Sequence, residues 1–180
     1  MMLFIILLIS QKLNSSQIYS TKEIAGYMDK NLKDNNLNYY YMVIDTENLL
    51  NDINFKMLSK YIENLNKKYD LSILVILTNK IQDNKNSSFL DELYNQVSFP
   101  QKLKKRKVLI IIITADDDNL QIIANEKFKP IFSEKVINNL ISKVKPLFKQ
   151  NEWFSNIFEL LKNVDILHQQ YNFNIKIEDL

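Results

Sequence analysis

The residues of this chain best suited to chemistry are three consecutive carboxylates, Asp116, Asp117 and Asp118, which separate apolar runs at 108–114 and 120–124. Carboxylate oxygens are the hard ligands that Ca²⁺ and Mg²⁺ prefer, and a divalent cation relieves the repulsion among neighbouring negative charges. Adjacent residues of one turn cannot all point inward, so we expect one or two ligands from this turn. The alternative is that Asp and Asn serve here only as turn-forming residues.

Asp45 is a further candidate ligand because it ends another apolar run, at 39–44. It joins the acidic turn only if its strand runs parallel to the strand at 108–114 and lies beside it. Its alternative role is to cap the segment that follows. The sequence therefore predicts a calcium or magnesium site whose candidate ligands are Asp116, Asp117, Asp45 and Asp118, with Glu126 as a further candidate ligand.

Other reaction types find little support in the residues present. Cysteine is absent and Gly26 is the only glycine, which excludes thiolate sites and the glycine-rich loops that cradle nucleotide phosphates. Asp45-Thr46-Glu47 follows an apolar run but lacks the second Asp of the haloacid-dehalogenase motif. His168 is the only histidine, which disfavours a Ser-His-Asp triad. A metal-assisted hydrolase stays open, with its catalytic residues unknown.

The elements that must position these residues alternate between strand and helix. Unbroken apolar runs at 39–44, 71–78 and 108–114 predict strands buried on both faces. The run at 120–124 predicts a strand that returns antiparallel through the acidic turn.

Helices are expected between and after these strands. Apolar residues at helical spacing follow caps at Asn51 or Asp52 and at Ser133, and they recur at 150–167. A short helix is expected after Ser87 or Ser88. We expect an α/β fold, a Rossmann-like three-layer α/β/α sandwich with a small mixed sheet flanked by about four helices.

The 180 residues, of which 46% are apolar and 24% charged, suit one globular domain. Residues 1–9 are almost wholly apolar, about the length of a signal-peptide core, and a buried strand or helix is the alternative. We expect a signal peptide at 1–20 cleaved near Ser16 or Ser20, a leader helix or arm at 21–38, the domain at 39–170 and a tail at 171–180. The tail alternates apolar residues and forms an edge strand or docks on the surface. The expected location is the secretory pathway, outside the cell or in an organelle lumen.

A run of cations precedes the strand at 108–114. The simpler interpretation is a solvated loop. The alternative is a docking surface for anionic lipid headgroups or an acidic partner. Nucleic acid is disfavoured because no aromatic residues alternate with these cations and the formal net charge is only +2. The residues concerned are Lys102, Lys104, Lys105, Arg106 and Lys107.

Several blocks, in this order, resemble the TPM domain family. Val43-Ile44-Asp45 followed by Leu49-Leu50 is similar to the family's opening segment before its first helix. The run at 71–78 resembles its second strand, and the strand, Asp116-Asp117 and strand at 108–124 resemble its acidic hairpin. Pro146-Leu147-Phe148 followed by Asn151-Glu152-Trp153-Phe154 is similar to the joint between its last helices. The resemblance covers about residues 43–167.

The resemblance implies a Rossmann-like α/β/α sandwich acting in a lumenal or extracytoplasmic space. It implies calcium or another divalent cation near the acidic turn, where Asp116 and Asp117 match the family and Asp118 is an additional carboxylate. It also implies either weak acid phosphatase activity or an accessory role for a membrane protein complex or receptor. Many members carry a transmembrane helix after the domain, whereas this chain shows none in its sequence.

The chain departs from the family where members usually carry glycines, before the central strand and after the second strand of the hairpin. Lysine-rich sequence and Ala124-Asn125-Glu126-Lys127 stand there instead. A ligand site that needs close backbone approach at that loop is therefore disfavoured. We expect a non-catalytic accessory or binding module, with a weak metal-dependent acid phosphatase as the alternative.

Overall fold

The structure is a computed structural model that describes residues 17–35, 41–82, 89, 92–93, 105–148 and 152–178. Its elements, in chain order, are β1 (Ile18–Tyr19), α1 (Thr21–Asn35), β2 (Tyr41–Asp45), α2 (Asp52–Tyr69), β3 (Leu71–Thr78), β4 (Lys80–Ile81), β5 (Lys107–Thr114), β6 (Asn119–Ala124), α5 (Glu134–Val144), a 3₁₀ turn η1 (Lys145–Leu147) and α6 (Trp153–Glu178).

A mixed sheet in the order β2-β3-β5-β6 forms the centre of the fold. β2, β3 and β5 run parallel, and β6 returns antiparallel to β5 through the acidic turn. Thr78 pairs with Thr114, so β3 and β5 finish level with each other. The predicted hairpin and mixed sheet are confirmed. We call the end at which the three parallel strands finish the carboxyl end of the sheet, and the other its amino end.

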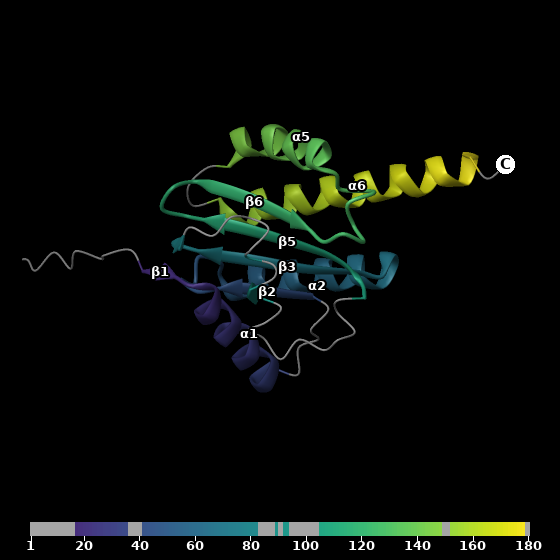
Figure 1. Ribbon diagram of the computed structural model, residues 1–180. Coiled ribbons are helices and arrows are strands. Elements are labelled where there is room, and N and C mark those ends of the chain that lie inside the picture. The colour runs from purple at the N-terminus through teal and green to yellow at the C-terminus, as the bar shows by residue number, and fades with distance from the viewer. Residues whose placement is uncertain are drawn as a thin grey trace, which may run out of the picture.

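Helices cover both faces of this sheet, as the apolar strands require (Figure 1). On one face, α2, α5 and α6 pack against the sheet through a cluster that includes Leu58, Leu140 and Ile157. On the other face, α1 packs through Ile24, Ala25 and Met28, together with Phe89 and Leu93. The described part of the chain therefore has the predicted three α/β/α layers.

Side-chain caps begin two of the helices where the sequence places them. Asn51 caps α2 by accepting a hydrogen bond from the N–H of Asn54, and Ser133 caps α5 by accepting from Val136. α2 ends at Asp70, which takes the left-handed conformation with φ 51°. In this glycine-poor chain, Asp and Asn take the left-handed positions, as these residues tolerate them best after glycine.

The segment predicted as a leader helix or arm forms α1, which packs into the second core cluster. Just before it, β1 pairs in parallel with β4 in a small second sheet that the sequence did not predict. Tyr19 of β1 is buried. Of the two expected cleavage positions, the one near Ser16 leaves β1 intact and the one near Ser20 removes it. Residues 1–16 lie outside the described residues.

The C-terminal tail differs from the edge strand that its alternation allowed. α6 continues through Phe173, Ile175 and Ile177 as far as Glu178. No Pro or Gly interrupts the sequence from Trp153 to Glu178, and each residue added to an existing helix gains a backbone hydrogen bond without a new nucleation cost. The edge-strand prediction is therefore wrong.

Other predictions fall partly outside the described residues. These include most of the short helix after Ser87 or Ser88, and Lys102 and Lys104 of the cation run. Within the residues that the structure describes, no helix is long and apolar enough to cross a membrane.

Gly26 supplies a test of α1. It is exposed in the middle of the helix, and a Cβ built there meets no atom within 4 Å. We expect Gly26→Ala to raise the free energy of unfolding by about 0.5–1 kcal/mol, because alanine costs less backbone entropy in a helix. Urea denaturation measures the change, and Gly26→Pro, expected to lose about 3 kcal/mol, is the control. Unchanged stability in the proline variant would mean that α1 does not contribute to the folded core.

Candidate functional site

Three threonines form a row across the carboxyl end of the sheet. Thr78 ends β3 and Thr114 ends β5, in paired register, and Thr46 follows the end of β2. Ile44 and Ile76, two residues earlier, belong to the cluster on the α1 face, so the threonines face that side of the sheet. The row, Thr46-Thr78-Thr114, therefore lines the place where ligands usually bind in open α/β sheets.

Hydrogen bonds join this row to a carboxylate at each side. The Thr46 hydroxyl donates to Thr78 Oγ1 at 2.9 Å and also contacts Glu47 Oε1 at 3.3 Å. On the other side, the Thr114 hydroxyl donates to a carboxylate oxygen of Asp117. Thr78 and Thr114 are both buried, so these bonds satisfy polar groups that water does not reach.

Glu47 also binds the N-terminal segment. The buried hydroxyl of Tyr19 donates to Glu47 Oε1 at 2.7 Å. Burial of this phenol, with the Glu47 carboxylate beside it, raises the pKa of Tyr19 above its ordinary value, so the phenol stays a hydrogen-bond donor. β1 is thereby fixed over the carboxyl end of the sheet, next to Thr46 and Thr78.

Asp45, the candidate ligand on β2, lies apart from this row. Its register partner Leu77 belongs to the cluster on the α2 face, the opposite side from the threonines. β3 separates β2 from β5, which puts the two strands about 10 Å apart. The two carboxylate oxygens of Asp45 accept from the N–H groups of Leu49 and Leu50, at 3.0 and 2.8 Å. The strands are parallel but not neighbours, and Asp45 organises its own loop.

The acidic turn projects from the same end of the sheet into solvent. Asp116, Asp117 and Asp118 are exposed. Backbone bonds fix the base of the turn, since Asp116 N–H donates to Asn79 O at 3.1 Å, and Asp118 takes the left-handed conformation with φ 47°. Among the described residues, no Lys or Arg forms an ion pair with these three carboxylates.

The structure thus brings together Asp116, Asp117 and Asp118, and it places Asp45 on the other face. Within the described ranges, no three acidic or histidine side chains converge as a metal-binding group. Asp117 and the exposed Asp116 are the carboxylates placed to offer oxygens to an ion at the turn. Whether they bind one stays a prediction.

His168 lies at the amino end of the sheet, away from every candidate ligand. Its ring stacks on Tyr69, at the end of α2, with centroids 4.0 Å apart, and approaches Phe128 at 6.0 Å. The eight residues of β5 separate the two ends of the sheet by about 23 Å. The imidazole is 2% exposed, and its Nε2 has no hydrogen-bond partner in the described part of the chain. His168 is therefore a packing residue that cannot reach the acidic turn.

Sequence reasoning missed Glu47, Tyr19 and the threonine row. The signal was present, because apolar runs that end at Thr78 and Thr114 and a Thr-Glu pair after Asp45 all point to one end of a parallel sheet. What was lacking was the register that sets Thr46, Thr78 and Thr114 side by side. The arrangement can bind a ligand through hydroxyl and carboxylate oxygens, and it contains no histidine to move a proton.

Comparison with known proteins places this geometry among related folds. A sequence profile of the TPM domain matches residues 43–165, more than half of the chain. The solution structure of the N-terminal domain of a protein from P. gingivalis aligns with a TM-score of 0.65 and 13% identity, covering 84% of this chain and 92% of that one. At this identity the second likeness shows the fold alone. Comparison with curated proteins gave no match.

Asp45 gives a test of the loop after β2. We expect Asp45→Ala to lower the free energy of unfolding by about 2–3 kcal/mol, since the N–H groups of Leu49 and Leu50 lose a charged acceptor. Urea denaturation measures this loss. Asp116→Ala, on the exposed turn, is the matched control and should change stability by less than about 0.5 kcal/mol. Equal effects of the two substitutions would contradict the assignment of Asp45 as the loop's organising residue.

His168 predicts a dependence of stability on pH. Burial lowers the pKa of His168, and the neighbouring Lys107 lowers it further, while Asp165 raises it and Lys68 lowers it. The folded pKa thus lies below the unfolded value of about 6.5, so the stabilising contribution is complete above that pH and is lost as pH falls below it. The loss reaches about 1.4 kcal/mol for each unit by which folding lowers the pKa.

The measurement is urea denaturation of wild type and His168→Phe between pH 7.5 and pH 5 (roughly the range in which only histidine titrates). Wild type should lose stability on acidification, and the phenylalanine variant, which keeps the stack on Tyr69, should lose less. Parallel curves for the two proteins would show that His168 does not titrate in this range.

Proposed function

The chain belongs to the TPM domain family, and from this premise we propose that it is a non-catalytic binding module whose acidic turn takes up a divalent cation, calcium foremost. In this proposal the module is secreted or lumenal and serves a membrane protein complex as an accessory protein. The acidic turn with its bound cation forms part of the surface that the partner contacts.

The observation that carries the proposal is the acidic turn itself. Its three exposed carboxylates stand side by side, and no Lys or Arg in the described part of the chain pairs with them. Coulomb repulsion among them favours binding of a cation. An exposed turn with oxygen ligands suits the irregular coordination of Ca²⁺ better than the strict octahedron of Mg²⁺. Asp117 is the ligand held best, because the Thr114 hydroxyl orients it.

Two placements support a binding role over catalysis. The only histidine lies at the amino end of the sheet. Asp45, the first acid of the Asp45-Thr46-Glu47 segment that was compared with a nucleophile motif, accepts hydrogen bonds from two backbone N–H groups. At the exposed turn water competes for every carboxylate, so its aspartates are poor general bases. The apolar residues 1–9 support the secretory location.

A weak metal-dependent acid phosphatase is the second candidate, and one contact favours it. The Thr46 hydroxyl lies 3.3 Å from Glu47 Oε1, at the end of the sheet that carries the acidic turn. A hydroxyl next to a carboxylate is the minimal arrangement of a nucleophile with its base. Tyr19 also donates to that same carboxylate oxygen, which weakens it as a base, so we rank this candidate below the binding module.

Calcium titration of the full chain by isothermal calorimetry tests the proposal. We expect a dissociation constant of about 10⁻⁴ to 10⁻³ M, as in extracellular calcium modules. Asp116→Asn/Asp117→Asn should weaken binding at least about tenfold, since it removes the two turn carboxylates that match the family. Glu126→Gln removes a charge near the amino end of the sheet and serves as the matched control, which should bind as wild type does.

Wild-type protein that gives no heat with millimolar calcium or magnesium would remove the cation from the proposal. The same proteins distinguish the second candidate through phosphate release from a generic phosphate ester. Release that depends on added metal and disappears in the double variant would favour the phosphatase. Release that is unchanged in the double variant would indicate a contaminating enzyme.

A further inference from the structure

Three lysines gather at the amino end of the sheet. Lys107 begins β5, Lys105 lies just before it, and Lys127 follows β6. Lys127 Nζ donates to the backbone carbonyl of Lys105 at 2.8 Å, which brings its charge to the start of β5. Among the described residues, none of the three forms an ion pair. We call Lys105, Lys107 and Lys127 the lysine cluster.

Asn125 holds the two loops of the lysine cluster together. Its side-chain oxygen accepts from the N–H of Val108 at 3.0 Å, and its side-chain nitrogen donates to the carbonyl of Arg106 at 2.8 Å. Asn125 is 8% exposed, so these bonds form away from water. The lysine cluster is therefore displayed by a fixed surface that joins the start of β5 to the end of β6.

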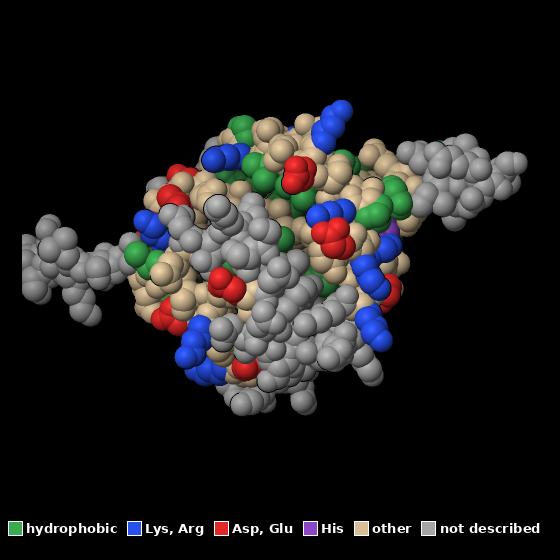
Figure 2. Space-filling view, in the orientation of Figure 1, with side chains coloured by type: hydrophobic (Ala, Val, Ile, Leu, Met, Phe, Trp, Pro, Cys, Tyr) green, Lys and Arg blue, Asp and Glu red, His purple; other side chains and the backbone are tan. Residues whose placement is uncertain are grey.

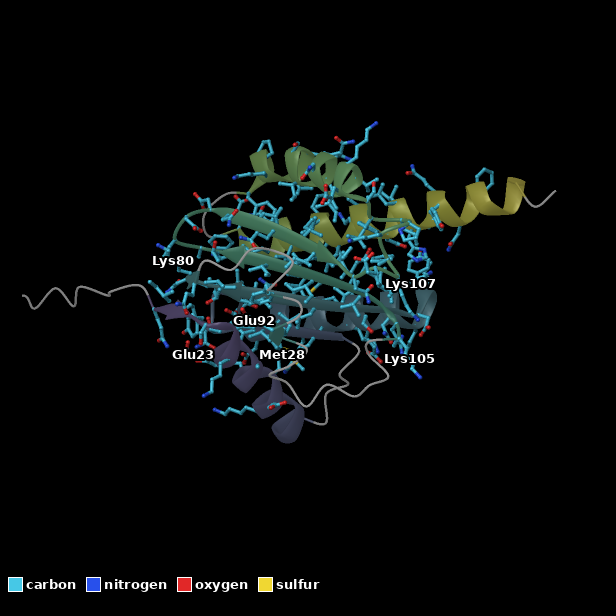
Figure 3. The ribbon with its side chains drawn as sticks, in the orientation of Figure 1. Glu23, Met28, Lys80, Glu92, Lys105 and Lys107 are labelled. Carbon is cyan, nitrogen blue, oxygen red and sulfur yellow. The ribbon has the colours of Figure 1, made fainter. Side chains whose placement is uncertain are left out.

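Among the described residues, three other cations at this end of the sheet form ion pairs. Lys68 pairs with Asp165, Arg106 with Asp70, and Lys129 with Glu126. The lysine cluster differs from these cations, since no ion pair with a described carboxylate neutralises it. Figure 3 places Lys105 and Lys107 at the end of the sheet toward which α6 projects, with Lys80 at the opposite end, and Figure 2 shows blue side chains gathered along that same end.

α6 extends past the sheet at the same end of the molecule (Figure 1). The last buried residue of α6 among those whose burial the structure describes is His168, and Tyr171 still packs against the core. The helix continues to Glu178, so the part from Phe173 to Glu178 projects by about 9 Å. Phe173, on this projecting part, is 65% exposed. An exposed aromatic ring at the same end of the molecule as lysines without an ion pair is a combination suited to the headgroup region of a lipid bilayer.

We propose that the lysine cluster and Phe173 form a docking surface for an anionic bilayer. The lysines attract the negative headgroups, and the Phe173 ring enters the interface between headgroups and acyl chains. Each lysine near an anionic leaflet strengthens binding about fivefold, so the cluster contributes roughly 100-fold. An acidic protein fits less well, because it gives an exposed phenylalanine on a projecting helix no apolar environment.

This inference goes beyond the proposed function, since it assigns a second surface and does not require calcium. It also fixes the orientation of the molecule. With the amino end on the bilayer, the acidic turn at the carboxyl end faces away, about the length of β5 from the lysines.

The test is flotation of the full chain with two kinds of vesicle. One is pure phosphatidylcholine, and the other is phosphatidylcholine with about 30% phosphatidylserine, which gives the vesicle surface the negative potential of an anionic leaflet. We expect binding to the anionic vesicles to exceed binding to the neutral ones. The difference between the two vesicles is the readout, because an apolar N-terminal segment would bind both alike. Added salt should reduce the difference in binding between the two kinds of vesicle, because counterions screen the charge of the lysines.

Lys105→Gln/Lys107→Gln/Lys127→Gln should reduce that difference roughly 100-fold. Lys22→Gln/Lys56→Gln/Lys135→Gln is the matched control, because it removes the same charge from exposed positions on α1, α2 and α5 and should bind as wild type does. Phe173→Ser should weaken binding to anionic vesicles while keeping its salt dependence.

Three results would overturn the proposal. These are equal binding of wild type to both vesicles, equal losses in the two triple variants, and binding to an acidic polypeptide such as polyglutamate with none to anionic vesicles. The salt dependence of wild type decides the question even if the cluster variant fails to fold.

Discussion

The fold depends on the burial of β3 and β5 on both faces. From Leu71 to Thr78 and from Val108 to Thr114 every residue is buried, and burying each Val, Leu or Ile side chain stabilises the fold by about 1.5–3 kcal/mol. Such strands are soluble only if helices cover both sides of the sheet. α1 is accordingly part of the core, because its Ile24, Ala25 and Met28 belong to the buried cluster that contains Ile110 and Ile112. The same requirement leaves only the two ends of the sheet for polar groups.

Those two ends have different structures. At the carboxyl end, the threonine row, Glu47 and Asp117 link the strand ends through side-chain hydrogen bonds, and the acidic turn stands outside them. At the amino end, Asn125 and His168 pack the loops and α6 against the sheet, and the charges lie around them. A polar residue in this chain is therefore best interpreted by the end of the sheet at which its strand places it. The face matters as well: Asp45 lies at the carboxyl end, yet its side chain faces α2 and accepts from the N–H groups of Leu49 and Leu50, so it is a structural residue.

The sequence predicted the parts that local pattern determines. The apolar runs, the Asn51 and Ser133 caps and the turn-rich hairpin each carry their signal within a few residues, and all of them are confirmed. β1 and β4 are too short for any periodicity, and they pair across about 60 residues of sequence, so only tertiary packing reveals them. The threonine row and the face of Asp45 depend on register, which a single sequence does not encode locally. The end of α6 was misjudged because three alternating residues fit a strand and a helix alike.

The separation of unpaired charge has a consequence that the net charge of +2 conceals. Within the described residues, the exposed carboxylates of the acidic turn at one end and the lysine cluster at the other contribute an electric dipole component along the strands. In the field of a charged surface such a dipole experiences a torque, which turns the molecule before it touches. The field falls off within about 8 Å at physiological salt, so this alignment acts during the final approach and raises the fraction of encounters that are productive. A protein of small net charge thereby has a preferred orientation as it approaches a charged surface.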